Sequence, residues 1–299
     1  MTSTKILKRR IKSAKNIAQI TKAMEMVAAS KMKRAQEQAL ESRPYAVKLQ
    51  EVIKSLMSSH KHFKHPLTRK NDSNKIMALL ISTNKSLCGG LNSNLFRMVY
   101  DWSDHFDKEN LQFVAVGKKG AEFVARNGFK LLADYSELGE KFEFADTLPI
   151  SRQLIQSYEK ENLKEIYIIY SDFVSTLVQK PKVFHLLPID PESLQSSEDE
   201  LEDAKNKEIF LPKEYIIEPN ADTILGWLLP YFVELEVYHY ILEANASEHS
   251  ARMVAMKNAT DNAKDIVGDL TLTFNKARQA QITAEINETA VASLVLKNE

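Results

Sequence analysis

Two long stretches that are almost free of glycine flank a turn-rich middle, and this unevenness limits what the chain can fold into. Of the 8 glycines among the 299 residues, six lie between positions 89 and 139. Apolar and small residues recur three and four positions apart from Thr4 to Met57, and this spacing returns between Pro219 and Glu299. Such spacing places apolar side chains on one face of an α-helix. We therefore predict a long helix at each end of the chain.

The lengths of these helices predict how they pair. Pro44 removes a backbone donor from the first helix, which predicts a kink or a local break. The second helix can reach about 75 residues, on the order of 110 Å at 1.5 Å per residue. Helices of this length are rarely stable alone. Because the middle segment ties their inner ends together, we expect them to pair antiparallel as a coiled coil.

The register of this pairing predicts a single-helix overhang. If Met57 lies near Asp222, then Thr4 lies near Asn275, and residues from about 276 to 299 extend beyond the partner helix. The overhang contains the run AVASLVL at 290–296, which is apolar on all sides and unstable in water unless enclosed. A sleeve formed by another protein would enclose it. A frayed terminus and a seam between identical chains are the alternatives.

The middle segment changes its hydrophobic period. Short apolar runs bounded by turn residues predict strands at 75–82, 112–116, 165–170 and 181–187. Helical spacing between them predicts helices at 91–106, 117–127 and 150–161. Strands that alternate with helices indicate a small Rossmann-like α/β domain with a largely parallel sheet. The predicted fold class is therefore a mixture of α+β and α/β, in which long terminal helices (1–58 and 220–299) form an antiparallel coiled coil around a central α/β domain (59–219).

Composition excludes several classes of protein. Lys plus Arg and Asp plus Glu both number 40, so no net charge attracts nucleic acid or an acidic membrane. The single cysteine, Cys88, excludes an internal disulfide and a multi-cysteine zinc site. No apolar run approaches the roughly 20 residues that a membrane span requires. We expect a soluble or peripheral protein.

Three features resemble sites of chemistry but are better explained as structure. Cys88 precedes two glycines without an evident base, so we interpret it as a small buried hydrophobe. The sequence GKKG at 117–120 lacks the full phosphate-loop pattern and predicts an ordinary strand-to-helix turn. His60, His62 and His65 would need a further ligand to hold a metal, and a solvated linker is the simpler interpretation. We expect no catalytic residue, no cofactor and no metal ion.

The first predicted helix is basic. Ten cations between Lys5 and Arg34 face a single acidic residue, Glu25. Such a stripe can bind nucleic-acid phosphates, cover an acidic protein surface, or remain a solvated face. Sequence alone leaves these three possibilities open.

Four segments, in order along the chain, resemble the gamma subunits of bacterial F-type ATP synthases. They are ITKAMEMVAASK (20–31), LCGGLN (87–92), ASEHSARMVAMKNATDNA (246–263) and LTLTFNKARQAQITAEINE (270–288). The resemblance covers nearly the whole chain. It implies a non-catalytic rotating central stalk that couples proton flow through a membrane ring to ATP synthesis on other chains. It also implies a peripheral protein on the cytoplasmic side of a bacterial inner membrane.

The same resemblance implies partners and contact residues. The partners are the alpha and beta subunits of the catalytic head, the epsilon subunit and the membrane c-ring, with no nucleic acid. The residues implied to contact the head are Lys22, Met24, Arg252, Arg278, Gln279, Thr283 and Glu285. Those implied to contact the ring are Tyr215, Ile217 and Glu218. The cations implied to meet an acidic segment of beta include Lys8, Lys12, Lys22, Lys31 and Lys33.

Two questions stay open beside this resemblance. The small residues Ala23, Ala28, Ala29 and Ala35 fit both a smooth bearing surface and a tightly packed coiled-coil seam. A basic coiled-coil protein that binds nucleic acid is the alternative function, and steep salt dependence of binding to a duplex would favour it.

Overall fold

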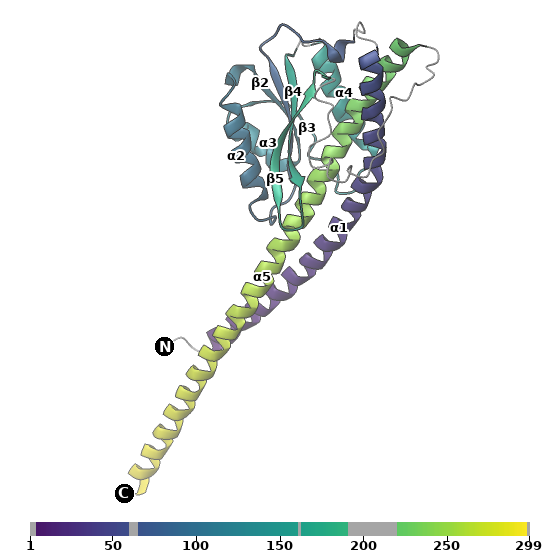
Figure 1. Cartoon of the computed structure of the whole chain (residues 1–299). Coiled ribbons are helices and arrows are strands. Elements are labelled where there is room, and N and C mark those ends of the chain that lie inside the picture. The colour runs from purple at the N-terminus through teal and green to yellow at the C-terminus, as the bar shows by residue number, and fades with distance from the viewer. Residues whose placement is uncertain (1–3, 60–64, 161–162, 191–219, 298–299) are drawn as a thin grey trace. The chain divides into compact units, whose positions relative to one another are not determined.

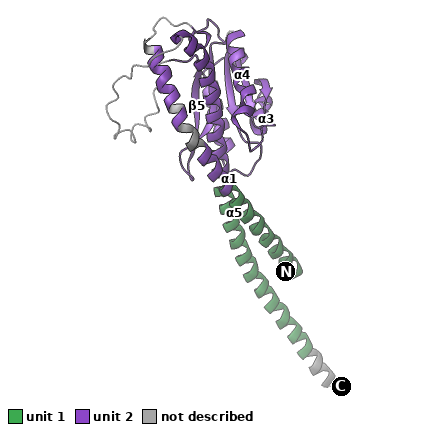
Figure 2. Ribbon diagram, turned by 90° about the vertical axis from the view of Figure 1, so that its right-hand side faces the viewer, with its two compact units in different colours: residues 1–29, 252–299 green, residues 30–251 purple. Residues whose placement is uncertain are grey.

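A computed structural model describes residues 4–59, 65–160, 163–190 and 220–297. The chain forms two compact units, which Figure 2 colours separately. Unit 1 comprises residues 1–29 and 252–299, and unit 2 comprises residues 30–251. The two long helices, α1 (Thr4–Ser59) and α5 (Ala221–Lys297), each contribute to both units (Figure 1).

Both predicted long helices are confirmed. Helix α5 contains 77 residues, close to the expected length. Helix α1 continues through Pro44, so the local break that we considered is absent. Pro44 is exposed, and backbone carbonyls on the solvent side of a helix can bond to water where a proline removes their donor.

Unit 2 contains a sheet of five strands in the order β3-β2-β1-β4-β5. The strands are β1 (Ile76–Ile81), β2 (Leu111–Val116), β3 (Lys130–Asp134), β4 (Glu165–Phe173) and β5 (Gln179–Leu187). All neighbours pair in parallel except β4 and β5, which form an antiparallel hairpin. The predicted largely parallel sheet is confirmed. Strand β3 was not predicted because it is a short edge strand with exposed polar ends, which weakens its apolar pattern.

The connecting helices are α2 (Leu91–Ser103), α3 (Lys118–Arg126) and α4 (Phe144–Lys160), with short 3-10 turns at Pro66–Thr68 and Lys108–Asn110. Helix α4 begins six residues before the predicted start at 150. The backbone N–H of Glu143 donates to the Asp146 carboxylate at 2.8 Å and so fixes the first turn. Pro149 lies inside the helix.

The two faces of the sheet explain why β1 is buried along its whole length. Met77, Leu79 and Ile81 belong to one apolar cluster, and Ile76, Ala78 and Leu80 belong to a second. The first cluster includes Ile53 of α1, Leu154 of α4 and Phe232 of α5. The second includes Leu95 and Val99 of α2 and Val124 of α3. Unit 2 is therefore a three-layer α/β/α structure, because alternate side chains of each strand point to opposite faces.

Hydrogen bonds between α1 and α5 confirm that the helices are antiparallel. In unit 1, the Thr21 and Thr260 hydroxyl oxygens lie 2.7 Å apart, and the Thr4 hydroxyl donates to Gln281 at 3.3 Å. Thr4 thus lies six residues further along α5 than the predicted position near Asn275, so the predicted start of the overhang was wrong. The physical reason lies in unit 2, where Gln50 donates to Glu236 at 3.0 Å. In this register the first residues of α5, from Ala221, extend beyond Ser59, the last residue of α1.

Candidate functional site

The helix pair of unit 1 has a seam of small side chains. Ala14, Ala28 and Ala263 are only 8%, 2% and 5% exposed. Small residues let helix axes approach closely, since the distance between axes depends on the side chains at the contact. Ala28 therefore belongs to a packed seam, whereas Ala23 on the same helix is exposed. The seam interpretation thus holds for Ala28, while a bearing surface at Ala23 stays a prediction.

The outer surface of unit 1 is unusually apolar. Large apolar side chains that are at least 43% exposed on its two helices are Ile6, Ile17, Ile20, Met26, Val27, Ile266, Leu272, Ile282 and Ile286. Ile282 and Ile286 are four positions apart, so they share one side of α5 beyond its last bond to α1. Exposed apolar side chains that gather on one side of a helix are typical of a site of interaction with other proteins. This surface, rather than a cleft, is the main candidate site in unit 1.

In unit 2, the carboxyl ends of the parallel strands are where α/β folds commonly bind ligands. Here the chain's own groups fill that position. The Ser82 hydroxyl oxygen accepts from the Gly120 N–H at 2.7 Å, and the Asn84 side-chain oxygen accepts from the Lys118 N–H at 2.9 Å. The Thr83 carbonyl oxygen accepts from the Lys119 N–H at 3.0 Å. The first three N–H groups of α3, which in other proteins hold phosphate, already have partners.

Gly117 is what allows this close approach. Its φ of +93° is in the left-handed region, and a Cβ atom there would lie 2.2 Å from the Ser82 carbonyl oxygen. Any other residue would push the end of β1 away from the start of α3. The segment predicted to be an ordinary strand-to-helix turn is thus a tightly packed one.

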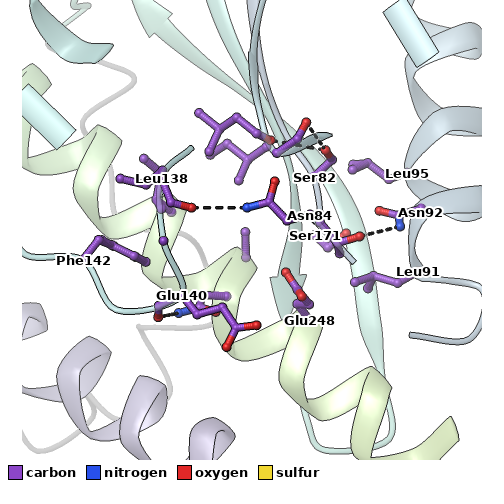
Figure 3. A pocket seen from close by; sticks show the side chains of 18 residues that line it. Ser82, Asn84, Leu91, Asn92, Leu95, Leu138, Glu140, Phe142, Ser171 and Glu248 are labelled. Carbon is purple, nitrogen blue, oxygen red and sulfur yellow. Dashed lines mark hydrogen bonds between the residues drawn. The ribbon is translucent and has the colours of Figure 1, made fainter. Parts of the chain in front are cut away.

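A small cavity lies beside this contact. Its volume is about 50 Å³, and its lining includes Asn84, Ser171, Glu140 and Glu248 (Figure 3). A cavity needs about 10 to 15 Å³ in this measure to hold one water molecule, whereas typical ligand pockets measure about 300 to 1,000 Å³. The cavity can therefore hold a few water molecules and is small for a ligand such as a nucleotide.

Glu140 connects three elements of unit 2 and was missed by the sequence analysis. Its carboxylate accepts hydrogen bonds from Lys31 of α1 and from Lys85 of the loop after β1, the latter at 2.8 Å. These two bonds, from Lys31 first and Lys85 second, lower the pKa of Glu140 from its ordinary 4.5 to about 2. Its backbone carbonyl also accepts from Asn245 of α5. No local pattern reveals such a residue, because Lys31 is 109 positions away.

Comparison with known proteins decides the family. A sequence model described as ATP synthase matches residues 3–292. The ATP synthase gamma chain of Dehalococcoides mccartyi strain CBDB1 is 44% identical over 288 residues, covering 96% of each chain. The gamma chain of Herpetosiphon aurantiacus is 41% identical over 306 residues, covering 99% of each. The chain belongs to the ATP synthase gamma chain family.

Solved structures of ATP synthases share the fold. The rotor of the Euglena gracilis mitochondrial ATP synthase superposes with a TM-score of 0.63 at 17% identity, covering 93% of this chain and 98% of that one. A chain from the Tetrahymena thermophila central stalk and c-ring gives a TM-score of 0.59 at 23% identity, covering 80% and 99%. The predicted fold class, with long terminal helices and a central α/β domain, is confirmed.

The residues that the gamma family implied for the head contact are spread along unit 1. Arg278, Gln279, Thr283 and Glu285 are exposed, while Arg252 is only 8% exposed. Arg252 and Glu285 lie about 50 Å apart along α5 at 1.5 Å per residue. These residues therefore form a row of separate points and not a pocket.

The α1 residues of the same set are arranged differently. Lys22 is exposed and its ammonium lies 2.9 Å from the Glu25 carboxylate, while Met24 is half-buried. Lys33 lies 3.8 Å from Glu37 in a similarly exposed pair. Together with the Lys31 pair, these contacts show that part of the basic stripe is matched by acids of the chain itself. Exposed pairs of this kind are weak and exchange easily.

The remaining candidates have structural roles or lie outside the described residues. Cys88 is 3% exposed and packs with Leu91 and Ala251, as expected for a small hydrophobe. The His65 Nδ1 accepts from the Leu67 N–H at 3.2 Å and caps a short helical turn. His60 and His62 lie outside the described residues.

The ring-contact residues also lie outside the described part of the chain, since Tyr215, Ile217 and Glu218 fall within 191–219. Within the described ranges, no helix combines the length and the apolar character needed to cross a bilayer. Those ranges likewise contain no group of three or more His, Cys, Asp or Glu residues arranged to hold a metal ion.

Proposed function

We propose that this chain is the central rotating shaft of an F-type ATP synthase and couples proton flow through the membrane ring to ATP synthesis on the catalytic beta subunits. The observation that carries the proposal is the family match over residues 3–292 together with the apolar outer surface of unit 1. The relatives are named ATP synthase gamma chain, and the solved neighbours belong to a rotor and to a central stalk with c-ring. A helix with exposed isoleucines fits inside a sleeve of head subunits.

The shaft works through differential contact. A ligand or partner shifts a conformational equilibrium only if it binds the alternative states differently. A shaft that presents a different face to each catalytic site meets this requirement. Its contacts must also be exchangeable, since a fully buried ion pair would hold one angle strongly. Arg278, Gln279 and Lys22 are exposed, which suits the second condition.

The partners of the shaft follow from this role. The alpha and beta subunits enclose the α5 segment that carries Arg278, Gln279, Thr283 and Glu285. The epsilon subunit and the c-ring are the other partners, and Tyr215, Ile217 and Glu218 are assigned to the ring. Arg252, Lys22 and Met24 complete the head contact. The nucleic-acid alternative has no support in the family match.

The chain itself has no catalytic site in this proposal. The groups that could have held a phosphate at α3 are bonded to Ser82, Thr83 and Asn84. The neighbouring cavity of about 50 Å³ is too small for a nucleotide. Catalysis then belongs to other chains of the complex. As a gamma subunit, this chain is proposed to be peripheral, on the cytoplasmic side of a bacterial inner membrane.

The test compares two double variants in the assembled, membrane-bound complex. Arg278→Ala with Gln279→Ala removes polar groups from the proposed head contact. Arg97→Ala with Asn94→Ala removes matched exposed groups from α2. ATP hydrolysis and ATP-driven acidification of vesicles are measured side by side, with subunit stoichiometry as the check on assembly. We expect acidification per ATP, or turnover itself, to fall only in the first variant.

Cys88→Ser and Lys118→Ala test the absence of chemistry in unit 2. Both should leave ATP turnover of the assembled complex unchanged. Loss of hydrolysis in either variant, with normal pumping by the Arg278 and Gln279 variant, would contradict the proposal.

A further inference from the structure

The loop between β3 and α4, residues 135–143, contacts several other elements of unit 2, and we call it the strap. The Leu138 carbonyl oxygen accepts from the Asn84 side chain at 3.2 Å, which fixes the strap to the loop after β1 (Figure 3). The Phe142 ring is 7% exposed and lies 6.1 Å, edge to face, from the Tyr238 ring of α5. The strap is therefore held to the sheet side by a polar contact and to α5 by apolar packing.

Glu140 is the point at which both long helices contact the strap. Its carboxylate accepts from Lys31 of α1, and its backbone carbonyl oxygen accepts from the Asn245 side chain of α5 at 3.5 Å. Unit 2 comprises residues 30–251, so Lys31 and Asn245 lie close to the positions at which α1 and α5 leave this unit. The strap thus joins the two helices at one level.

The ion pair with Glu140 matters because α1 has little other attachment at this level. The apolar cluster that includes the inner face of the sheet takes in Leu49 and Ile53 of α1. Leu49 lies about five helical turns beyond Lys31. Of the side chains described between Lys31 and Leu49, only Ala35 is buried. Apolar packing therefore holds the far part of α1, whereas the ion pair ties its near part to the strap.

We propose that Lys31 is a positioning residue of the shaft, which through Glu140 keeps α1 fixed relative to α5 where both helices leave unit 2. The inference rests on the proposed function, because a shaft transmits torque only if its helices turn as one body. It also changes the assignment of Lys31, which the family resemblance implied to meet an acidic segment of beta. Lys31 pairs with an acid of its own chain and acts on the head through the position of α1.

A comparison with Lys33 shows why Lys31 is suited to this role. The Lys33 side chain is 77% exposed and lies 3.8 Å from Glu37, so that pair stays within α1 and holds no second element in place. Glu140 instead accepts from Lys31 and also from Lys85 of the loop after β1. Charges that form a network contribute more than isolated surface pairs. The network at Glu140 therefore joins α1, the strap and the sheet.

Hydrogen exchange of the purified chain tests whether the ion pair holds the strap. Lys31→Gln removes the ammonium group from which Glu140 accepts. Backbone amides of the strap should then exchange faster by about 1.5- to fivefold, the shift in a local opening equilibrium that loss of a partly exposed ion pair produces. Lys31→Arg keeps the charge and should exchange like the wild type. Lys48→Gln removes a pair with Glu51 inside α1 and should leave the strap unchanged.

A double-mutant cycle in the assembled, membrane-bound complex tests the positioning role. The measured quantity is ATP-driven acidification per ATP hydrolysed, with subunit stoichiometry as the check on assembly. Lys31→Gln should lower this ratio by up to about fivefold. The same substitution added to Glu140→Gln should lower it no further, because the pair is already broken. Lys31→Arg and Lys48→Gln should keep the wild-type ratio.

Three results would overturn the proposal. The first is strap exchange that Lys31→Gln leaves unchanged, since the ion pair would then hold nothing. The second is faster exchange with a normal acidification ratio, since Lys31 would then only stabilise the fold. The third is a loss of the ratio that is equally large in the wild-type and Glu140→Gln backgrounds, since Lys31 would then contact the head directly.

Failure of the shaft assignment itself would look different. It would appear as a normal ratio in the variant that combines Arg278→Ala with Gln279→Ala. The exchange experiment uses the isolated chain and does not depend on that assignment.

Discussion

The two compact units of the chain are stabilised in different ways. Unit 2 buries large side chains on both faces of a sheet, and residues such as Ile53, Leu79 and Phe113 have no exposed surface. Unit 1 buries mainly small residues such as Ala28 and Thr260, while Ile17 and Ile286 remain 53% and 62% exposed. The same residue type is thus core in one unit and surface in the other.

This difference shows which unit is complete without partners. A buried isoleucine contributes about 1.5 to 3 kcal/mol relative to an exposed one. In unit 2, the unit's own residues bury the isoleucines, so the fold gains this contribution without a partner. In unit 1 the contribution becomes available only when another protein covers the exposed side chains, so binding energy is left for the head subunits.

Ile53 and Ile17 give the largest expected contrast, because they are the same residue on the same helix. Ile53→Ala should lower the free energy of unfolding by about 2 to 5 kcal/mol, since it leaves a cavity in the core. Ile17→Ala should change it by less than about 0.5 kcal/mol. Urea unfolding of the purified chain, followed by circular dichroism, measures both. Equal losses would mean that the outer face of unit 1 is already packed.

Ala28 and Ala23 test the seam of unit 1. Ala28→Leu inserts a large side chain at a position that is 2% exposed, and overpacking should cost about 1 to 3 kcal/mol. Ala23→Leu adds the same atoms on the exposed side of α1 and should be nearly neutral. The helical signal on heating should be lost earlier only in Ala28→Leu. A cost at Ala23 would place that residue in the seam as well.

Much of the fold could be predicted because the local spacing of apolar residues indicates helices and strands. The two long helices and four of the strands follow from the spacing of apolar residues over many positions. Strand β3 and the start of α4 were missed, and β3 is a short strand with exposed polar ends. The coiled-coil register was six residues off because it depends on where α5 begins relative to Ser59, which periodicity does not specify.

The candidate site residues also fall into two groups, those that lie in contiguous motifs and those that only folding brings together. The exposed residues Arg278 and Gln279 could be proposed from the sequence because contiguous motifs carry the family resemblance. Glu140 was missed because it joins segments that are far apart in the sequence. Only the folded chain brings such residues together, so no spacing rule identifies them.

Glu140 provides a smaller, pH-dependent contrast within unit 2. Its pKa, lowered to about 2, makes its contribution to stability present above about pH 4.5 and lost as the pH falls toward 2. Glu140→Gln should cost about 1 kcal/mol at pH 7, since both lysine partners are partly exposed, and the difference from wild type should shrink in acid. Unfolding at pH 7, 4 and 3 measures this. Glu137→Gln, exposed in the same loop, should show no such trend.

The smallest effect on stability separates a solvated charge from a partner contact. Lys22→Ala removes an exposed pair three residues apart on α1, and Lys48→Ala removes another of the same spacing with Glu51. Both substitutions should cost about 0.2 to 0.5 kcal/mol in the isolated chain. In the assembled complex only Lys22 lies in the unit proposed to meet the head, so only Lys22→Ala should lower ATP-driven acidification. If both variants pump equally well at verified stoichiometry, Lys22 is merely a solvated charge and the head contact rests on α5 alone.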